Sequence, residues 1–360
     1  MATTLKLAEE LDDTPYRLRA LWGLCIDQFN SGKASTALEL ARRFAGLVAR
    51  SADAIELMKA DRILATSFHY LGDQKNARLH IDRALAHDAT LTWQNQIVRS
   101  RFDLRVSAHY FQARILWLQG YADQALHMVE ENIEEGRDVG QVLSFCSVLG
   151  QGACPIAFLA GDLEAAEQYC AMLIEHTERH PVRLWNIWAR CFNGLVMARR
   201  GDIAGGLQVL RDGLDQAGEA RFLPRFLLVQ GEQAQLLGKV GEVGQALEGV
   251  DQMLARCESR DEGWYVAELL RIKGGLMLKR NGPSALVDAE AMFRRSLEEA
   301  RRQGALSWEL RTAMNLARLW SDLGRRPDAG ALIRPVYSSF TEGFATDDLR
   351  AAKELLEELP

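Results

Sequence analysis

The stretch ARILWLQGYADQALHMV (Ala113–Val129) holds the pattern that decides the fold. Gly120 has a small residue seven positions before it, an alanine five positions after it and an apolar residue nine positions after it. The same arrangement returns at intervals of 40 to 48 residues around Gly32, Gly72, Gly120, Gly161, Gly201, Gly241, Gly282 and Gly324. A period in this range is typical of repeat arrays rather than of a domain with one compact core.

Three columns of residues keep their character through the eight units. Seven positions before the glycine stand Cys25, Ala65, Ala113, Cys154, Gly194, Ala234, Gly275 and Ala317. Five positions after it stand Ala37, Ala77, Ala125, Ala166, Gly206, Ala246, Val287 and Ala329, and nine positions after it Ala41, Ile81, Val129, Cys170, Leu210, Val250, Ala291 and Ile333. These columns predict a helical hairpin in each unit, in which the glycine ends the first helix and small residues let the two helices pack closely.

This unit resembles the tetratricopeptide repeat, with loops longer than usual. Larger segments resemble the carboxy-terminal helical region of bacterial multidomain signalling proteins: WGLCIDQFNSG (22–32), AELLRIKGGLML (267–278), and WELRTAMNLARLWSDLGRRPDAGALI (308–333) followed by YSSFTEGFATDDLRAAKELL (337–356). In that family a winged-helix domain or a class III nucleotidyl cyclase precedes a predicted ATPase, and the helical region follows. The resemblance covers only the non-catalytic part, so it implies a protein-interaction or ligand-sensing module and carries over no catalytic residue.

The expected fold is all-α: a right-handed α-solenoid of about eight hairpins, with about 17 helices and no sheet. We expect the eight repeats over residues 14–345 and a capping helix over 346–360, which begins at Thr346 and buries Leu349, Ala352, Leu355, Leu356 and Leu359. Residues 1–13 read as the last helix of an incomplete upstream repeat. Its apolar residues Leu5, Leu7, Ala8 and Leu11 predict a surface that a partner or a second copy covers.

Two segments depart from the regular period. Residues 88–99 (HDATLTWQNQIV) account for the longest interval, and they predict a longer loop or an extra turn before the third unit. In the fourth unit, Pro155 stands where the first helix should run. Because proline removes a helical hydrogen bond, we expect this helix to be kinked or to start late.

Composition bounds the function classes. The 360 residues include 43 basic and 49 acidic side chains, a net charge of −6, which argues against nucleic-acid binding and against a polybasic membrane contact. We find no run of 18 apolar residues, and the amino terminus is charged, so the expected location is the cytoplasm. The six cysteines form no C-x-x-C pair and suit a reducing compartment.

Motifs for catalysis, cofactors and metals were sought and are weak. SGKAS (31–35) lacks the earlier glycine and the following hydroxyl of a phosphate-binding loop, and it is better explained as a repeat turn. His176 and His180 stand four residues apart, as two metal ligands on one helix face would, but no third ligand follows. We therefore expect neither an enzyme nor a bound cofactor or metal.

A binding site is predicted from geometry instead. In such an array the first helices line a concave surface, toward which residues three, six, ten and thirteen positions before each glycine point. In the first three units these offsets select aromatic and basic residues, which suit an extended peptide or an acidic ligand. They are Arg19, Trp22, Phe29, Lys59, Arg62, His69, Tyr110, Arg114 and Trp117. Later units are blander, with Ala198, Gly238 and Ser321 at the same offsets. The alternative is that these aromatic residues only pack between helices.

Two function classes follow. The first is a non-catalytic module that binds a protein or peptide partner, or senses a ligand for an upstream ATPase or cyclase. The second is a helical-repeat enzyme or nucleic-acid-binding protein, against which the missing acid and base groups and the acidic balance weigh. Identity of the ligand or partner is not encoded in any motif of the chain.

Overall fold

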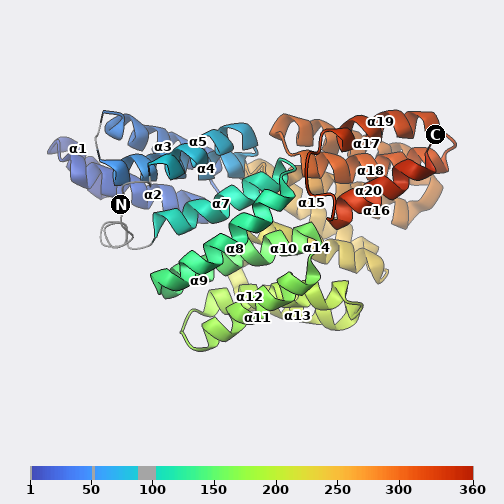
Figure 1. Cartoon of the computed structure of the whole chain (residues 1–360), viewed down its shortest axis with the longest axis horizontal. Coiled ribbons are helices and arrows are strands. Elements are labelled where there is room, and N and C mark those ends of the chain that lie inside the picture. Colours follow the sequence, from blue (N-terminus) through green and yellow to red (C-terminus); the bar gives the residue numbers. More distant parts are fainter. Residues whose placement is uncertain (1, 51–52, 88–102, 360) are drawn as a thin grey trace.

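A computed structural model describes residues 2–50, 53–87 and 103–359. Within these ranges every regular element is a helix, and no strand is present. The helices pair into hairpins that wind as a right-handed α-solenoid (Figure 1). The expected departure at residues 88–99 lies outside the described residues.

The first four hairpin units occupy the amino-terminal half. They are α2 (Thr14–Asn30) with α3 (Ala34–Val48), α4 (Ala54–Leu71) with α5 (Gln74–Ala86), α7 (Leu104–Leu118) with α8 (Ala122–Val139), and α9 (Val142–Ser147), the π-helical turn η2 (Val148–Ala153) and α10 (Cys154–Ala160) with α11 (Leu163–Glu178). The short helix α1 (Ala2–Glu10) precedes them and packs on α2.

The last four units and a closing helix follow. They are α12 (Arg183–Arg199) with α13 (Ile203–Ala217), the 3-10 turn η3 (Gly218–Phe222) and α14 (Phe226–Lys239) with α15 (Val243–Arg260), α16 (Val266–Asn281) with the 3-10 turn η4 (Gly282–Ala285) and α17 (Leu286–Gln303), and α18 (Leu306–Asp322) with α19 (Arg326–Ser338). Helix α20 (Asp347–Glu358) packs on α18 and α19, and it buries Leu349, Ala352 and Leu355.

In the second, fourth and fifth units, the turn between the two helices is built from a glycine and an aspartate. Gly72 takes the left-handed conformation (φ 82°) that ends α4, and the next residue, Asp73, accepts the backbone N–H of Asn76 at 3.0 Å. Asp162 caps α11 and Asp202 caps α13 in the same way. Each carboxylate satisfies a backbone donor that the first helical turn leaves free, and so fixes where the second helix starts.

In every unit but the seventh, the residues of the two small-residue columns are buried. Ala113, Cys154 and Ala317 are fully buried. Between α12 and α13 the backbones approach so closely that a Cβ on Gly206 would overlap the carbonyl oxygen of Gly194. A larger side chain in these columns would therefore separate the two helices.

The seventh unit does not follow the predicted columns. Val287 is 81% exposed and Ala291 is also exposed, while Ala289 and Phe293 take the buried positions of the second helix. In α16 the residue against the second helix is Gly274, whose Cβ would lie 2.8 Å from Phe293, whereas Gly275 has open space beside it. The 3-10 turn η4, with Pro283 in it, delays the start of α17 and shifts the register of the whole unit.

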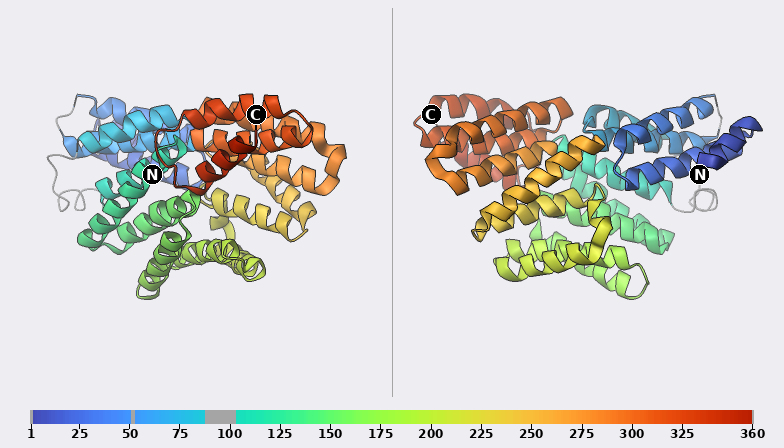
Figure 2. Two further views of the ribbon diagram at one scale, coloured as in Figure 1. Left: turned by 45° about the vertical axis from the view of Figure 1, so that its right-hand side comes forward. Right: turned by 180° about the vertical axis from the view of Figure 1, so that it is seen from behind.

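The solenoid closes on itself after about one superhelical turn. Figures 1 and 2 show the blue amino-terminal units lying beside the orange and red carboxy-terminal units. The glycine turns of the first four units each contact a later part of the chain. The first turn contacts the end of unit six, and the second turn contacts unit seven. The third turn contacts unit eight, and the fourth turn contacts α20. Tyr70 O, for example, accepts the backbone N–H groups of Gly263 (2.7 Å) and Trp264 (3.2 Å).

The fourth unit contains the irregularity expected around Pro155. The first helix passes through the π-helical turn η2 before Pro155, which then stands in the first turn of α10. A π-turn leaves a carbonyl without its helical partner, and here the Trp188 indole N–H donates to Gly150 O. Val142–Ala160 is also long and apolar enough to cross a membrane, with a mean hydropathy of 1.7, although polar residues such as Ser144 and Gln151 interrupt its apolar run. Since 78% of its window is buried inside the fold, its apolar side chains serve the protein interior.

The two ends differ in how they pack. In α1, Leu5 and Ala8 are buried, whereas Leu7 (55%) and Leu11 (70%) are exposed. Thr346 holds the N-cap position of α20, but its hydroxyl donates to Gly343 O instead of capping the helix.

Candidate functional site

The nine predicted groove residues lie along the inner side of units one to three, but they do not line an open groove. Arg19 is exposed and Trp22 is half-buried, while Phe29, Lys59, Arg62, His69, Tyr110, Arg114 and Trp117 are buried. The prediction of an open concavity is therefore wrong. The physical reason is the pitch of the superhelix, which brings the carboxy-terminal units against these side chains.

The outer part of this surface is a cation–aromatic cluster. The Trp22 ring has the Arg62 guanidinium 5.5 Å and the Lys59 ammonium 5.9 Å from its centroid. Lys59 also pairs with Glu56 at 3.1 Å, and Arg62 Nε donates to Ser107 Oγ at 2.5 Å. Such contacts hold the cations in place without any ligand.

Deeper in, aromatic rings from distant units meet. His69 packs against Tyr70, Phe111 and Trp264 at centroid distances of 5.3, 5.9 and 5.7 Å. Burial, helped by the charge of Arg114, lowers the pKa of His69 to about 3 in spite of its hydrogen bond to Gln74. His69 is thus a neutral packing residue at physiological pH.

A small cavity lies next to these rings. Its walls come from α7, α10, α12, α14 and the segments before α14 and α16, and they comprise Arg114, Trp117, Leu118, Pro155, Ile156, Leu159, Trp188, Arg225, Leu228 and Trp264. The Arg114 guanidinium lies 4.7 Å from the centroid of Trp264, and that of Arg225 lies 5.6 Å from Trp185. Two of the predicted residues, Arg114 and Trp117, therefore do line one hollow, together with residues that the offset rule did not select.

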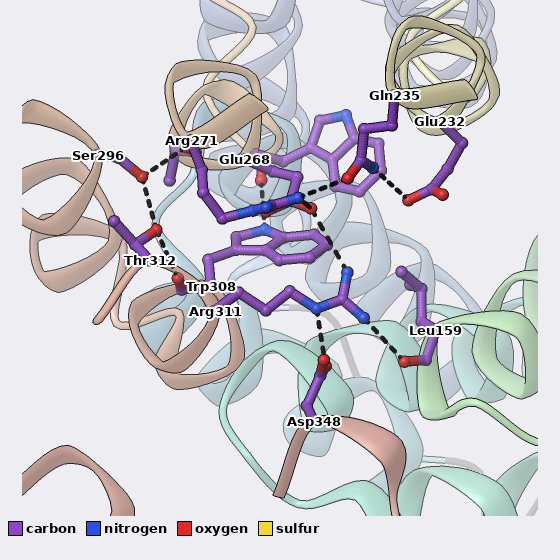
Figure 3. Close-up of polar contacts among 12 residues, drawn as sticks. Leu159, Glu232, Gln235, Glu268, Arg271, Ser296, Trp308, Arg311, Thr312 and Asp348 are labelled. Atoms are coloured by element: carbon purple, nitrogen blue, oxygen red, sulfur yellow. Dashed lines mark hydrogen bonds and ion pairs between the residues drawn. The ribbon is translucent and has the colours of Figure 1, made fainter. Parts of the chain in front are cut away.

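On the carboxy-terminal side the inner surface carries a paired charge network (Figure 3). Glu268 accepts from Arg271 at 2.7 and 2.8 Å and from Arg311 at 3.5 Å. Arg311 also donates to Asp348 Oδ2 at 2.7 Å and to Leu159 O at 3.0 Å. The network thereby joins units four, seven and eight to α20.

The network continues to unit six, and each of its arginines faces a carboxylate. Arg271 donates to Gln235, which donates to Glu232 at 3.0 Å. Burial alone would raise the pKa of Glu268, but Arg271 and Arg311 lower it below its usual value. Burial likewise opposes the charge of Arg311, and Asp348 and Glu268 raise its pKa. The shifts of Glu268, Arg271 and Arg311 all favour the charged forms of these groups, so we interpret the network as structural.

Sequence reasoning missed this network because of the register shift in unit seven. Glu268 and Arg271 stand fourteen and eleven positions before Gly282, one more than the inward offsets of thirteen and ten. Arg311 does stand thirteen positions before Gly324, so the eighth unit contained a usable signal.

An open groove lies between the fifth and sixth units. Helix α13 touches α14 at far fewer positions than α11 touches α12 or α15 touches α16, because η3 and the following loop separate the two units. The space between α13 and α15, over α14, has a volume of about 960 Å³. Its walls are polar and apolar in about equal parts, and the polar residues include Arg211, Asp215, Glu219, Arg221, Gln230, Gln233, Gln245, Glu248, Gln252, Arg256 and Arg260, with Gly249 between them.

The histidine pair His176 and His180, considered above as possible metal ligands, makes packing contacts. His176 Nε2 contacts Val142 O at 3.3 Å, and its ring packs on Phe145 and His180. Among the residues that the structure describes, no three His, Cys, Asp or Glu side chains are placed to share a metal ion.

Comparison with known proteins agrees with this architecture. The tetratricopeptide repeat family model matches residues 106–131 and 310–335, which contain the turns of units three and eight. The chain is therefore a helical-repeat protein, two segments of which match the tetratricopeptide repeat. A solved Rap protein complexed with competence and sporulation factor has a TM-score of 0.57 and 14% identity, covering 90% of this chain and 80% of its own.

Two further proteins are similar to this chain or to part of it. A tetratricopeptide repeat protein from Parabacteroides merdae ATCC 43184 covers 82% of this chain and 98% of its own, with a TM-score of 0.45 and 14% identity. An uncharacterised protein from Rhizobium meliloti (strain 1021) is 27% identical over 172 residues, which are 47% of this chain. The matched stretch spans only 16% of that relative.

Proposed function

We propose that this helical-repeat protein is a non-catalytic module that binds a polypeptide partner in the groove between α13, α14 and α15. The observation that carries the proposal is this groove of about 960 Å³, since the inner surface that such arrays commonly use is filled by the chain itself. A volume of this size takes a peptide segment of several residues.

The chemistry of the groove fits an extended segment of mixed charge. Gln230, Gln233, Gln245 and Gln252 offer amide groups that can pair with a peptide backbone. The groove walls contain both arginine and carboxylate side chains, so neither an acidic nor a basic partner is favoured alone.

Gly249 is a position at which the backbone of a partner can approach α15 closely. It lies inside α15, where glycine costs roughly 0.5 to 1 kcal/mol relative to alanine. Nothing in the described chain requires it, because a Cβ there would have no neighbour within 4 Å. A partner backbone lying against α15 would use the space that the missing side chain leaves.

The signalling context belongs to the same proposal. Resemblance of the sequence to the helical region of multidomain signalling proteins, and the match to a short part of a much longer relative, support a role as the interaction or sensing arm of an ATPase or cyclase system. The Rap structure, which holds a bound factor, supports polypeptide binding by this fold. A cytoplasmic location is part of the proposal.

A crosslinking experiment with matched variants tests the groove. Benzoylphenylalanine replaces Gln233 on the groove floor, and its adducts are identified by mass spectrometry in cells that naturally carry the chain. Gly249→Arg fills the groove, whereas Gly244→Arg changes the same helix outside it, at another glycine without neighbours.

We expect one polypeptide adduct whose yield falls at least about tenfold with Gly249→Arg and is kept with Gly244→Arg. Loss in both variants, loss in neither, or absence of any adduct would contradict the proposal.

A further inference from the structure

The cavity near the superhelix axis contains two guanidinium groups and no acid. Arg114 is only 6% exposed, and it makes no hydrogen bond or ion pair with any described residue. Arg225 is half-buried, lines the same cavity from the segment before α14, and likewise makes no hydrogen bond or ion pair with any described residue. An unpaired buried charge is costly, so these two arginines require an explanation.

The paired network of Figure 3 shows how this chain treats arginines elsewhere on its inner surface. Arg271 and Arg311 face Glu268 and Asp348, and these carboxylates raise the pKa of both guanidinium groups against the effect of burial. Burial lowers the pKa of Arg114 and Arg225, and only tyrosines oppose it; Arg114 lowers that of Arg225 further. The cavity therefore has an uncompensated positive potential.

The other walls of the cavity are apolar and aromatic. Three indole rings, those of Trp117, Trp188 and Trp264, line it with Ile156 and Leu159. Contact of Arg114 with the Trp264 face offsets part of the cost of burial, but an indole ring carries no charge. The free volume is about 10 Å³, the room that one water-sized sphere needs.

We propose that this cavity binds one small monovalent anion, a halide ion or a single carboxylate group, between the guanidinium groups of Arg114 and Arg225. Charge-assisted hydrogen bonds from both groups give the anion the partner that the chain does not supply. The site is separate from the polypeptide groove, none of whose residues line it.

Anion binding at this place stabilises the closed solenoid. The cavity walls come from units three, four, five and six and from Trp264 before α16, so the bound charge contacts parts of the chain that meet only after the superhelix closes. A ligand that binds only the folded form raises the melting temperature as its concentration rises.

The test measures this anion dependence in four full-length proteins. Thermal unfolding of the wild type, Arg114→Met, Arg225→Met and the control Arg190→Met is followed in rising sodium chloride, in rising sodium acetate and in sodium sulfate at equal ionic strength. Arg190 is exposed on α12, outside the cavity, so its variant reports the effect of losing a surface charge. Line broadening of the ³⁵Cl magnetic resonance signal measures chloride binding directly.

We expect chloride or acetate to raise the melting temperature of the wild type and of Arg190→Met more than sulfate does. Binding should weaken at least about tenfold in Arg114→Met and Arg225→Met. Arg225 is less buried, so Arg225→Met keeps the test valid if Arg114→Met does not fold. Chloride broadening that acetate reverses indicates a site open to both sources, and stabilisation by acetate without chloride broadening indicates a carboxylate site. The same anion response in all four proteins would overturn the proposal.

Discussion

The eight repeat glycines all have a positive φ but have different surroundings in the two halves of the molecule. Gly32, Gly72, Gly120 and Gly161 lie against units six to eight or α20, so a Cβ would collide at Gly32, Gly120 and Gly161 and would be tightly packed at Gly72. Gly201, Gly241, Gly282 and Gly324 have nothing within 4 Å of that position. One sequence signal thus serves two purposes: it ends a helix everywhere, and in the first half it also permits one superhelical turn to rest on the next.

The largest effect is expected when a contact between the two halves of the molecule, that of Arg311, is removed. Arg311→Met leaves Glu268 and Asp348 without a cation that they share, and it frees Leu159 O beside the fourth turn. We expect a loss of about 3 to 5 kcal/mol in the free energy of unfolding, measured by urea denaturation. Arg318→Met, exposed on the same helix, should stay within about 0.5 kcal/mol, and equal losses in both would contradict the role given to the network.

Glu262, which lies over the turn of the first unit, predicts that the free energy of unfolding depends on pH. Glu262 is buried beside Gly32, where burial raises its pKa to about 7 although Arg256 and Arg260 oppose the shift. Between about pH 4.5 and 7 the folded protein keeps a proton that the unfolded chain has lost, so the free energy of unfolding falls as pH rises and levels off above this window. The fall is on the order of 3 kcal/mol.

Glu262→Gln removes this titration and should flatten the pH profile while stabilising the protein above pH 7. Glu258→Gln, at an exposed site in the last turn of α15, is the control and should follow the wild type. If the free energy of unfolding of Glu262→Gln changed with pH in parallel with that of the wild type, titration of Glu262 would not be the cause of the pH effect.

Substitution of matched glycines tests the contrast directly. Gly120→Ala and Gly241→Ala both place a side chain in the left-handed region, at about 1 kcal/mol each. At Gly120 the new methyl group also meets Leu306 and Phe340 at 2.9 Å, which should add about 1 to 3 kcal/mol. Calorimetric melting should therefore show Gly120→Ala as the less stable variant. Equal melting temperatures would mean that packing against another unit does not distinguish the turn at Gly120 from the turn at Gly241.

The smallest expected effect concerns the register of the seventh unit. Gly275→Ala should raise stability by about 0.5 to 1 kcal/mol, because alanine is the better helix former and meets no neighbour there. Gly274→Ala should lower stability, because its methyl group would lie 2.8 Å from Phe293. Chemical denaturation measures both variants. If Gly275→Ala were the less stable of the two, Gly275 rather than Gly274 would face the second helix, as the sequence columns predict.

The features that sequence reasoning predicted are local. Gly72, Asp73 and Ala77 act within one hairpin, and short-range geometry fixes their roles. Closure depends instead on the rotation between successive units, a small angle that accumulates over several repeats and that no residue encodes alone. For that reason Arg114 and Trp117 could be placed on the inner side, but Arg225 and Trp264, which complete the cavity, could not be associated with them. The shift at η4 hid Glu268 and Arg271 in the same way.

The closing contacts also bear on how the chain folds. Ser307 Oγ donates to Trp117 O across 190 residues of sequence, and Gly343 N donates to Asp123 across 220. An open repeat array folds through neighbouring units and can start anywhere, whereas contacts of such separation form only after most of the chain has been synthesised. The amino-terminal units therefore leave the ribosome with their inner aromatic surface uncovered, and their final stability is acquired last, when the eighth unit and α20 arrive.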